Sequence, residues 1–210
     1  MKTILFQGDS ITDCGREDGY GCGYALLVTA DLGLENPGAY QFLNRGISGN
    51  RITDVYARIK SDIINLKPDY MSILIGVNDV WHEELYQNGV DADKFEKIYC
   101  MMIEEILTAL PDIKIMILAP FCLEGIHTTN TEAYPNRWAG FRDGVAERAR
   151  RAKAVAEKFG LPFITLQDKF DAAAQTAENS YWTYDGVHPT PMGHQIIKNE
   201  WLKAFRELDK

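Results

Sequence analysis

Short apolar runs alternate along the chain with longer segments of helical period, and this alternation constrains the fold more than any other feature. The runs are rich in isoleucine, leucine and phenylalanine without strict alternation of polar and apolar residues, which is typical of strands covered on both faces. They occupy residues 3–6, 40–43, 70–75, 114–119 and 162–166. Strands that alternate with helices predict a parallel sheet with helices packed on both sides.

The segments between these runs carry apolar residues at helical spacing. One stripe follows Arg51 and consists of Ile52, Val55, Tyr56, Ile59, Ile63 and Leu66. Similar stripes predict helices over residues 95–110 and 141–159, the second with a basic cluster that we expect to form a solvated face. Thr190 and Pro191 suit the N-cap and first turn of a last helix.

Length and charge restrict the organisation of the chain and its partners. With 210 residues, of which 46% are hydrophobic and 25% charged, the sequence suits one globular domain, which we predict to span residues 1–210. The formal net charge is −8. Because this charge repels nucleic-acid phosphates and anionic lipid surfaces, we expect neither a nucleic-acid nor a membrane partner.

The N-terminus and the cysteines indicate a cytoplasmic protein. The first apolar run ends at Phe6 and is soon followed by Asp9, so it is too short for a secretion signal. No apolar stretch approaches the roughly 20 residues that span a bilayer. Four cysteines lack a CxxC spacing, and we expect them to be reduced thiols. They are Cys14, Cys22, Cys100 and Cys122.

Polar motifs follow the first three predicted strands. They read GDS at residues 8–10, NRGISGN at 44–50 and GVND at 76–79. Ligands bind beyond the carboxyl ends of parallel strands, near the point where the strand order reverses. In a flavodoxin-like order, 2-1-3-4-5, the second and third strands flank the first at about 4.8 Å. The three motifs should therefore converge on Ser10.

A fourth motif, YDGVHP at residues 184–189, supplies the groups that a serine nucleophile needs. A serine hydroxyl requires a hydrogen-bonded base, which is itself held by a third group. Asp185 and His188 are three residues apart and can meet within one turn, which leaves one imidazole nitrogen free to face Ser10. Candidate donors to an oxyanion are the backbone N–H groups of Ser10 and Gly49 and the side-chain amide of Asn78.

The blocks QGDSIT, NRGISGN, GVND and DGVHP resemble, in order and separation, the conserved blocks of the GDSL/SGNH hydrolases. The resemblance implies a three-layer α/β/α, flavodoxin-like SGNH hydrolase fold with a five-stranded parallel sheet of order 2-1-3-4-5. It also implies a serine esterase that works through an acyl-enzyme, with Ser10 as nucleophile, Asp185 and His188 completing the triad, and Gly49 and Asn78 in the oxyanion hole. The G-x-S-x-G elbow of the α/β-hydrolases is absent from the sequence.

Longer strings, among them GDSITDCGR and GVNDVW, are similar to those of intracellular bacterial carbohydrate esterases that deacetylate xylo-oligosaccharides. This likeness implies a small-molecule substrate, an acetylated oligosaccharide, and a homo-oligomer without a cofactor. His82, His127 and His194 lack the paired spacing of a metal site, so we expect no metal.

Three further side chains are candidates for substrate contact, each with a structural alternative. Arg51 follows the second motif, and its alternative is a surface ion pair. Trp81 and Tyr184 could offer a stacking face to a sugar, and their alternative is core packing. Residues 120–138, the one long irregular stretch, should lie on the substrate side of the sheet.

Two other functions stay open at this point. One is a lipid-directed esterase, thioesterase or lysophospholipase of the same family. The other is a non-catalytic flavodoxin-like binding module, for instance one that holds FMN.

Overall fold

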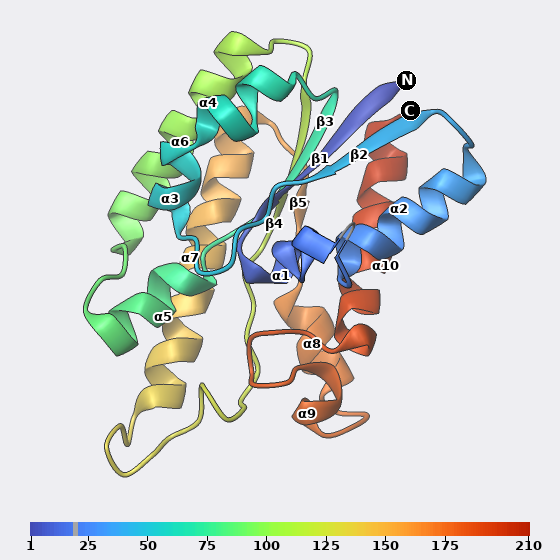
Figure 1. Ribbon diagram of the computed structural model, residues 1–210. Coiled ribbons are helices and arrows are strands. Elements are labelled where there is room, and N and C mark those ends of the chain that lie inside the picture. The colour runs from blue at the N-terminus through green and yellow to red at the C-terminus, as the bar shows by residue number, and fades with distance from the viewer. Residues whose placement is uncertain (19–20) are drawn as a thin grey trace.

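A parallel sheet forms the centre of the computed structural model, which describes residues 1–18 and 21–210. Its strand order is β2-β1-β3-β4-β5, as predicted, and every neighbouring pair is parallel (Figure 1). The strands are β1 (Lys2–Gly8), β2 (Tyr40–Asn44), β3 (Tyr70–Leu74), β4 (Lys114–Leu118) and β5 (Phe163–Ile164).

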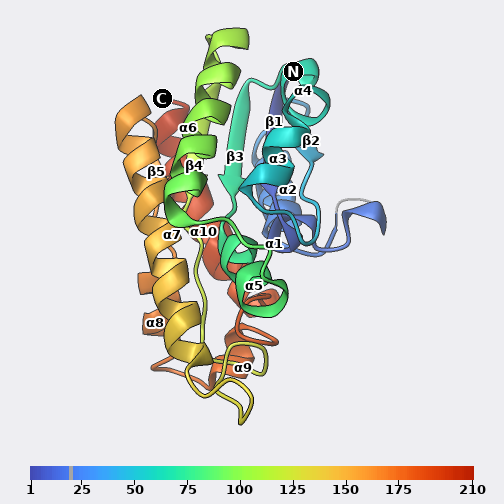
Figure 2. The same cartoon turned by 90° about the vertical axis from the view of Figure 1, so that its left-hand side faces the viewer.

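Helices cover both faces of the sheet (Figures 1 and 2). One face carries α2 (Tyr24–Glu35), α8 (Gln167–Ala173) and α10 (Pro191–Leu208). The other carries α3 (Ile52–Ala57), α4 (Ile59–Asp62), α6 (Ala92–Ala109) and most of α7 (Arg137–Phe159). The remaining helices are α1 (Ser10–Asp13), α5 (Val77–Tyr86) and α9 (Asn179–Trp182), with 3-10 turns at η1 (Arg16–Asp18) and η2 (Ile64–Leu66). In the part of the chain that the structure describes, no helix combines the length and apolarity needed to cross a bilayer.

Strand β1 shows why the apolar runs lack a polar face. Ile4 and Phe6 pack into the core on the α2 and α10 side, whereas Leu5 packs into the core on the α6 side. All three side chains are at most 1% exposed. A strand buried on both faces has no position for a solvated residue, and its sequence therefore shows no alternation.

Strand β5 is shorter than the apolar run that predicted it. Only Phe163 and Ile164 pair with β4, and two residues later Leu166 is the N-cap of α8. Leu166 is nevertheless fully buried. An apolar run reports burial and not backbone conformation, so it could not locate the end of this strand.

The helix predicted after Arg51 is interrupted at Arg58, between α3 and α4. The interruption lets the Arg58 guanidinium reach back toward the sheet, where it donates to the Gln7 side chain at 2.7 Å and the Asn50 side chain at 2.8 Å. It also donates to the Arg45 carbonyl at 2.8 Å. These bonds tie β1 to the segment that leaves β2.

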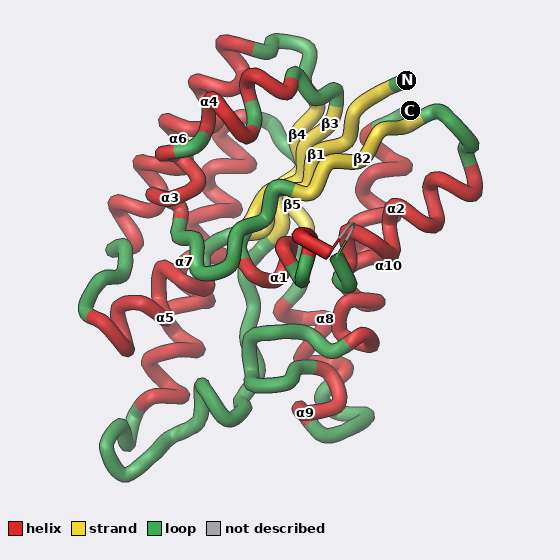
Figure 3. Tube along the Cα trace, viewed as in Figure 1, coloured by secondary structure: helices red, strands yellow, loops and turns green. Residues whose placement is uncertain are grey.

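The carboxyl ends of β1, β2 and β3 open onto one edge of the sheet, where loops collect (Figure 3). There the segment after β2 passes so close to α1 that only glycine fits at position 46. A Cβ on Gly46 would lie 2.3 Å from the Asp13 nitrogen and 2.7 Å from the Thr12 carbonyl carbon. Both contacts are backbone and cannot yield by a rotamer change.

We expect Gly46→Ala to lower the free energy of unfolding by about 1–3 kcal/mol, because the added methyl forces two backbone segments apart. Gly33→Ala is the matched control, since Gly33 is in α2 and, apart from the chain neighbours and the nearby helix backbone, no described atom lies within 4 Å of the added Cβ. That variant should gain about 0.5–1 kcal/mol. Urea unfolding measures both, and a Gly46→Ala protein as stable as the wild type would contradict the close approach.

Candidate active site

Ser10 is the first residue of α1 and lies two residues after the end of β1. Asp9 is the N-cap of this helix, and its carboxylate accepts the backbone N–H of Ile11 at 3.0 Å. The cap fixes the turn between strand and helix. It therefore holds the Ser10 hydroxyl at the carboxyl end of β1, between the segments that leave β2 and β3.

The structure brings Ser10, His188 and Asp185 into one hydrogen-bonded chain. Ser10 Oγ lies 2.8 Å from His188 Nε2, and His188 Nδ1 lies 2.6 Å from Asp185 Oδ2. The second carboxylate oxygen accepts the backbone N–H groups of Val187 at 2.9 Å and His188 at 2.8 Å. With its Nδ1 proton donated to the carboxylate, the imidazole presents the Nε2 lone pair to the serine, the arrangement that general-base chemistry needs.

The long segment between β4 and α7 holds the turn that carries Asp185 and His188. The backbone N–H of Leu123 donates to the Gly186 carbonyl at 2.8 Å, and that of His127 donates to the Asp185 carbonyl at 3.0 Å. Gly186 has a φ of +102°, and a Cβ there would lie 2.5 Å from a side-chain oxygen of this segment. The irregular stretch expected on the substrate side thus also positions two of the three site residues.

Charge around the imidazole favours its protonated form. Burial alone would raise the pKa of Asp185, but the hydrogen bonds from His188 and from the turn outweigh it and lower this pKa. The hydrogen bond to Asp185 in turn raises the pKa of His188 above its usual range, and the carboxyl of Asp9 adds to the effect. The histidine is thereby made a stronger base than a free imidazole.

Two further carboxyl groups are buried beside the site. Burial raises the pKa of both Asp9 and Asp79 to about 7. Asp79 accepts the backbone N–H of Ile52 at 3.2 Å, which joins the start of α5 to the start of α3. The half-buried Arg148 partly offsets the effect of burial on Asp79, and its guanidinium donates to the Val90 carbonyl at 2.6 Å. Arg148 belongs to the basic cluster of residues 141–159 that we expected on a solvated helix face, and for this residue the expectation was wrong.

Ser10 opens into a pocket of about 450 Å³. Gly49 and Asn78, the two other candidate oxyanion donors, line the same pocket. Gly49 has a φ of +81°, a conformation that favours glycine. One Asn78 amide N–H donates to the Asn50 carbonyl at 3.1 Å, which orients the amide and leaves its second N–H for another acceptor. The remaining lining residues are Ser48, Trp81, His82, Leu85, Tyr86, His127 and His188.

The three candidates for substrate contact lie in different surroundings. Trp81 lines the Ser10 pocket, with its ring centroid 5.7 Å from that of His188. Arg51 is not among the lining residues of this pocket: it pairs with Asp54 at 2.9 Å and donates to the Asn88 carbonyl at 2.6 Å. Its ion-pair alternative is therefore the one that the structure presents.

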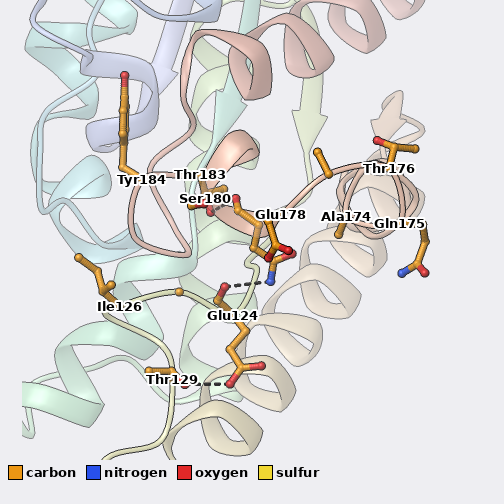
Figure 4. A pocket seen from close by; sticks show the side chains of 13 residues that line it. Glu124, Ile126, Thr129, Ala174, Gln175, Thr176, Glu178, Ser180, Thr183 and Tyr184 are labelled. Atoms are coloured by element: carbon orange, nitrogen blue, oxygen red, sulfur yellow. Dashed lines mark hydrogen bonds between the residues drawn. The ribbon is translucent and has the colours of Figure 1, made fainter.

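Tyr184 lines a different and larger cavity, of about 700 Å³, between the segment after β4 and the chain around α9. Figure 4 shows its ring directed away from Glu124 and Glu178. The residue is 64% exposed. Glu124 accepts the Thr129 hydroxyl at 2.8 Å, and its carbonyl accepts the Asn179 amide at 2.9 Å. Tyr184 is thus not packed in the core.

Several residues of the Ser10 pocket escaped the sequence analysis. His127 was treated only as an unlikely metal ligand, yet its ring lies 5.5 Å from that of Trp81. Leu85 and Tyr86 come from the last turn of α5. Leu85 is four residues after Trp81, a spacing that places both on one helix face, so the sequence did hold a signal for it.

The model of the GDSL-like lipase/acylhydrolase family matches residues 6–196 of the chain. The chain belongs to this family. It is accordingly a carboxylic ester hydrolase, as the four sequence blocks implied. A non-catalytic flavodoxin-like module therefore has no further support.

Known relatives resemble the chain over almost its whole length. An acetylxylan esterase from Geobacillus stearothermophilus is 32% identical over 218 residues, which cover 97% of this chain and 94% of the relative. A crystal structure of an acetylxylan esterase from that organism superposes with a TM-score of 0.83, at 31% identity, over 97% of this chain and 93% of the other. Two further structures of that esterase are catalytic mutants in which a serine and an aspartate, respectively, are replaced by alanine.

A further similar structure is that of an α/β-hydrolase enzyme from the metagenome of Lake Arreo, Spain. It is 29% identical, covers all of this chain and 97% of its own length, and has a TM-score of 0.84. Sequence and fold therefore place the chain among hydrolases with the same three-layer arrangement.

The hydrogen bond between Asp185 and His188 generates a test in which the pH profile is the readout. Asp185→Asn removes the negative acceptor that raises the pKa of His188. We expect kcat/KM on a chromogenic acetate ester to fall by about 10³–10⁴-fold. Since a base must be neutral, wild-type activity should be lost as the pH falls through a pKa above 6.5, and the residual activity of the variant should persist to lower pH.

Asp91→Asn is the control, because Asp91 is an exposed aspartate at the start of α6 whose partner is Lys94. It should keep both the rate and the profile. An Asp185→Asn enzyme whose acid limb stays at the wild-type pH would contradict the assigned coupling.

Proposed function

We propose that this hydrolase removes acetyl groups from O-acetylated carbohydrates such as xylo-oligosaccharides, with Ser10 as its nucleophile. The observation that carries the proposal is the unbroken hydrogen-bonded chain from Ser10 through His188 to Asp185, opening into a pocket beside Gly49 and Asn78. The substrate class is supported by the acetylxylan esterase that resembles this chain over nearly the full length of both proteins. That esterase also has catalytic mutants at a serine and at an aspartate.

In the first half of the proposed reaction, Ser10 Oγ forms a bond to the acetyl carbonyl carbon as its proton passes to His188 Nε2. The carbonyl π electrons move to oxygen, and the resulting tetrahedral oxyanion is held by hydrogen-bond donors. When the intermediate collapses, the bond to the sugar oxygen breaks, and His188 returns the proton to that oxygen. The sugar leaves as a free alcohol, and Ser10 carries the acetyl group.

The second half reverses these roles with water. His188 takes a proton from a water molecule, whose oxygen attacks the acetyl-Ser10 carbonyl. Collapse of the second tetrahedral intermediate breaks the bond to Ser10 Oγ, which recovers its proton from His188. Acetic acid is released and loses its remaining proton to solvent as acetate. Throughout, Asp185 stays ionised and holds the imidazole in one orientation.

The donors proposed for the oxyanion are the backbone N–H groups of Ser10 and Gly49 and the free amide N–H of Asn78. Gly49 brings no side chain into the pocket, and apart from its chain neighbours no described atom lies within 4 Å of where its Cβ would be. The bond from Asn78 to the Asn50 carbonyl pre-orients the amide before substrate arrives. Each such donor typically contributes about 3–4 kcal/mol to transition-state stabilisation.

Of the three candidates for sugar contact, Trp81 is the one that we propose. It lines the pocket beside His188, and an indole face packs well against the apolar face of a pyranose. Polar side chains complete the surroundings, among them Ser48, His82 and His127. Tyr86 adds a second aromatic ring and Leu85 an aliphatic side chain, and the polar groups between them can bond sugar hydroxyls.

Acetate release from a panel of acetylated oligosaccharides and acetylated monosaccharides tests the proposal, with Ser10→Ala as the inactive control. We expect wild-type enzyme to release acetate and Ser10→Ala to lose at least about 10³-fold in rate, because no other hydroxyl contacts His188 Nε2 among the described residues. Full esterase activity in Ser10→Ala would refute the nucleophile.

A series of chromogenic esters from acetyl to octanoyl separates the carbohydrate esterase from a lipid-directed one. For a deacetylase, kcat/KM should be highest for acetyl and fall by about 10-fold or more as a few methylene groups are added, because the pocket does not accommodate them. A preference for octanoyl would instead favour the lipid-directed esterase, thioesterase or lysophospholipase.

We further propose a single functional domain over residues 1–210, a cytoplasmic location and a homo-oligomer. The segments that form the site either follow strands of one sheet or, for the turn of Asp185 and His188, bond to the segment after β4. Reduced cysteines suit the cytoplasm.

Large exposed apolar side chains lie on segments around the site, as an interface between subunits would need. They are Leu85, Tyr86, Ile126, Tyr134, Tyr181 and Tyr184. Sedimentation velocity and cell fractionation test the last two proposals, and a monomer or a secreted protein would contradict them.

A further inference from the structure

Two cysteines meet at the end of the helix that carries Ser10. Cys14 is the C-cap of α1, in a left-handed conformation with φ +37°, and its N–H donates to the Ser10 carbonyl at 3.0 Å. Cys22 Sγ lies 2.8 Å from Cys14 Sγ. The Cys22 backbone N–H and thiol are 2.7 Å and 3.0 Å from the Cys14 carbonyl oxygen, so the two residues are also joined through the backbone.

A histidine completes this cluster. The backbone N–H of Tyr24 donates to His194 Nδ1 at 3.1 Å, so that nitrogen carries no proton. Burial lowers the pKa of His194 to about 4, and the ring is therefore neutral at physiological pH. Its single proton must sit on Nε2, which lies 3.5 Å from Cys14 Sγ. The imidazole thus donates toward the sulfur, a contact that favours sulfur in its anionic, reactive form.

We propose that Cys14 and Cys22 are a redox modification site, at which a reversible disulfide forms next to the nucleophile helix. In a reducing compartment the pair rests as two thiols, in agreement with the expected reduced cysteines. The other two cysteines have no such partner among the described residues: Cys100 lies in α6, and Cys122 is buried after β4.

The oxidant that we infer is a small disulfide such as oxidised glutathione. The exposed Cys22 loses its proton to water and attacks one sulfur of the oxidant, which breaks the S–S bond of the oxidant and releases one glutathione thiolate. Cys14 then loses its proton and attacks Cys22 Sγ, and the second glutathione leaves as a thiolate. Both thiolates take up protons, so two protein thiols are oxidised as one glutathione disulfide is reduced to two thiols.

The order of the two steps follows from the surroundings of each sulfur. Burial, together with the hydrogen bond and charge of Cys22, raises the pKa of Cys14 to about 12, so Cys14 is the poorer first nucleophile. Once Cys22 is in a mixed disulfide, it carries no charge and no thiol proton. Two of the three main causes of the high pKa of Cys14 are then gone, and the His194 N–H remains.

The cysteine pair is connected to the segment after β2, which carries the proposed oxyanion donor Gly49, as well as to Ser10. Asp13, the neighbour of Cys14, accepts the Ser48 backbone N–H at 2.9 Å and the Ser48 hydroxyl at 2.8 Å. A disulfide that closes the nine residues 14–22 would restrain the end of α1 without displacing these groups. We therefore expect oxidation to raise the unfolding midpoint by about 5 °C or more and to leave kcat/KM within about two-fold.

The test equilibrates wild-type enzyme with oxidised glutathione, alkylates the remaining thiols and determines intact mass and disulfide-linked peptides. The proposal predicts two alkylated cysteines, a Cys14–Cys22 linked peptide, a raised unfolding midpoint and full reversal by dithiothreitol. Cys22→Ser should remain without an intramolecular disulfide, and the matched Cys100→Ser should oxidise like the wild type.

Three results would overturn the proposal. They are four alkylated thiols after oxidation, a glutathione adduct at Cys22 that Cys14 does not resolve, and a linkage that involves Cys100 or Cys122. Each is read from wild-type protein alone, so the outcome does not depend on whether a cysteine variant folds. Esterase activity of the reduced enzyme is measured in parallel, which separates this test from the proposed function.

Discussion

The site depends on the backbone ladder that pairs β1 with β2 on one side and with β3 on the other. In this register Phe6 lies opposite Asn44 and Gly8 lies opposite Leu74, so the segments leaving three strands start at the same edge of the sheet. Parallel pairing makes this convergence unavoidable, because every carboxyl end points the same way. The pocket beside Ser10 is then built from the segments after β2 and β3, and a close approach that only Gly46 permits locks the first of these against α1.

The proposed base comes from a part of the chain that no strand positions. Asp185 and His188 lie in a turn that is held by backbone hydrogen bonds to the segment after β4. Two nearby carboxyl groups raise the pKa of His188. Asp185 acts by direct hydrogen bonding, and Asp9 acts through its charge. Burial of carboxyl groups opposes stability, and the structure compensates with backbone donors and, for Asp79, with the charge of Arg148.

Much of this arrangement could be predicted from the sequence, because the strand order and the strand-end motifs follow from periodicity and from the geometry of parallel sheets. Features set by tertiary packing could not. Leu166 extends an apolar run beyond its strand because its side chain is buried in the core, although its backbone no longer pairs with β4. Arg51 was a candidate substrate contact, but it pairs with Asp54, three residues later in the sequence, at a spacing typical of an ion pair. Tyr184 follows no such rule, and only the path of the chain around α9 shows that it faces a second cavity.

The central claim is that Ser10 is the one hydroxyl activated by His188, and labelling with a serine-directed phosphonate tests it most directly. Ser48 lines the same pocket but donates its hydroxyl to Asp13, which makes Ser48→Ala a matched control. The account predicts one phosphonate per chain, mapped to the Ser10 peptide, present in Ser48→Ala and absent in Ser10→Ala and in unfolded protein. Stoichiometric labelling at another residue, or undiminished labelling of Ser10→Ala, would contradict it.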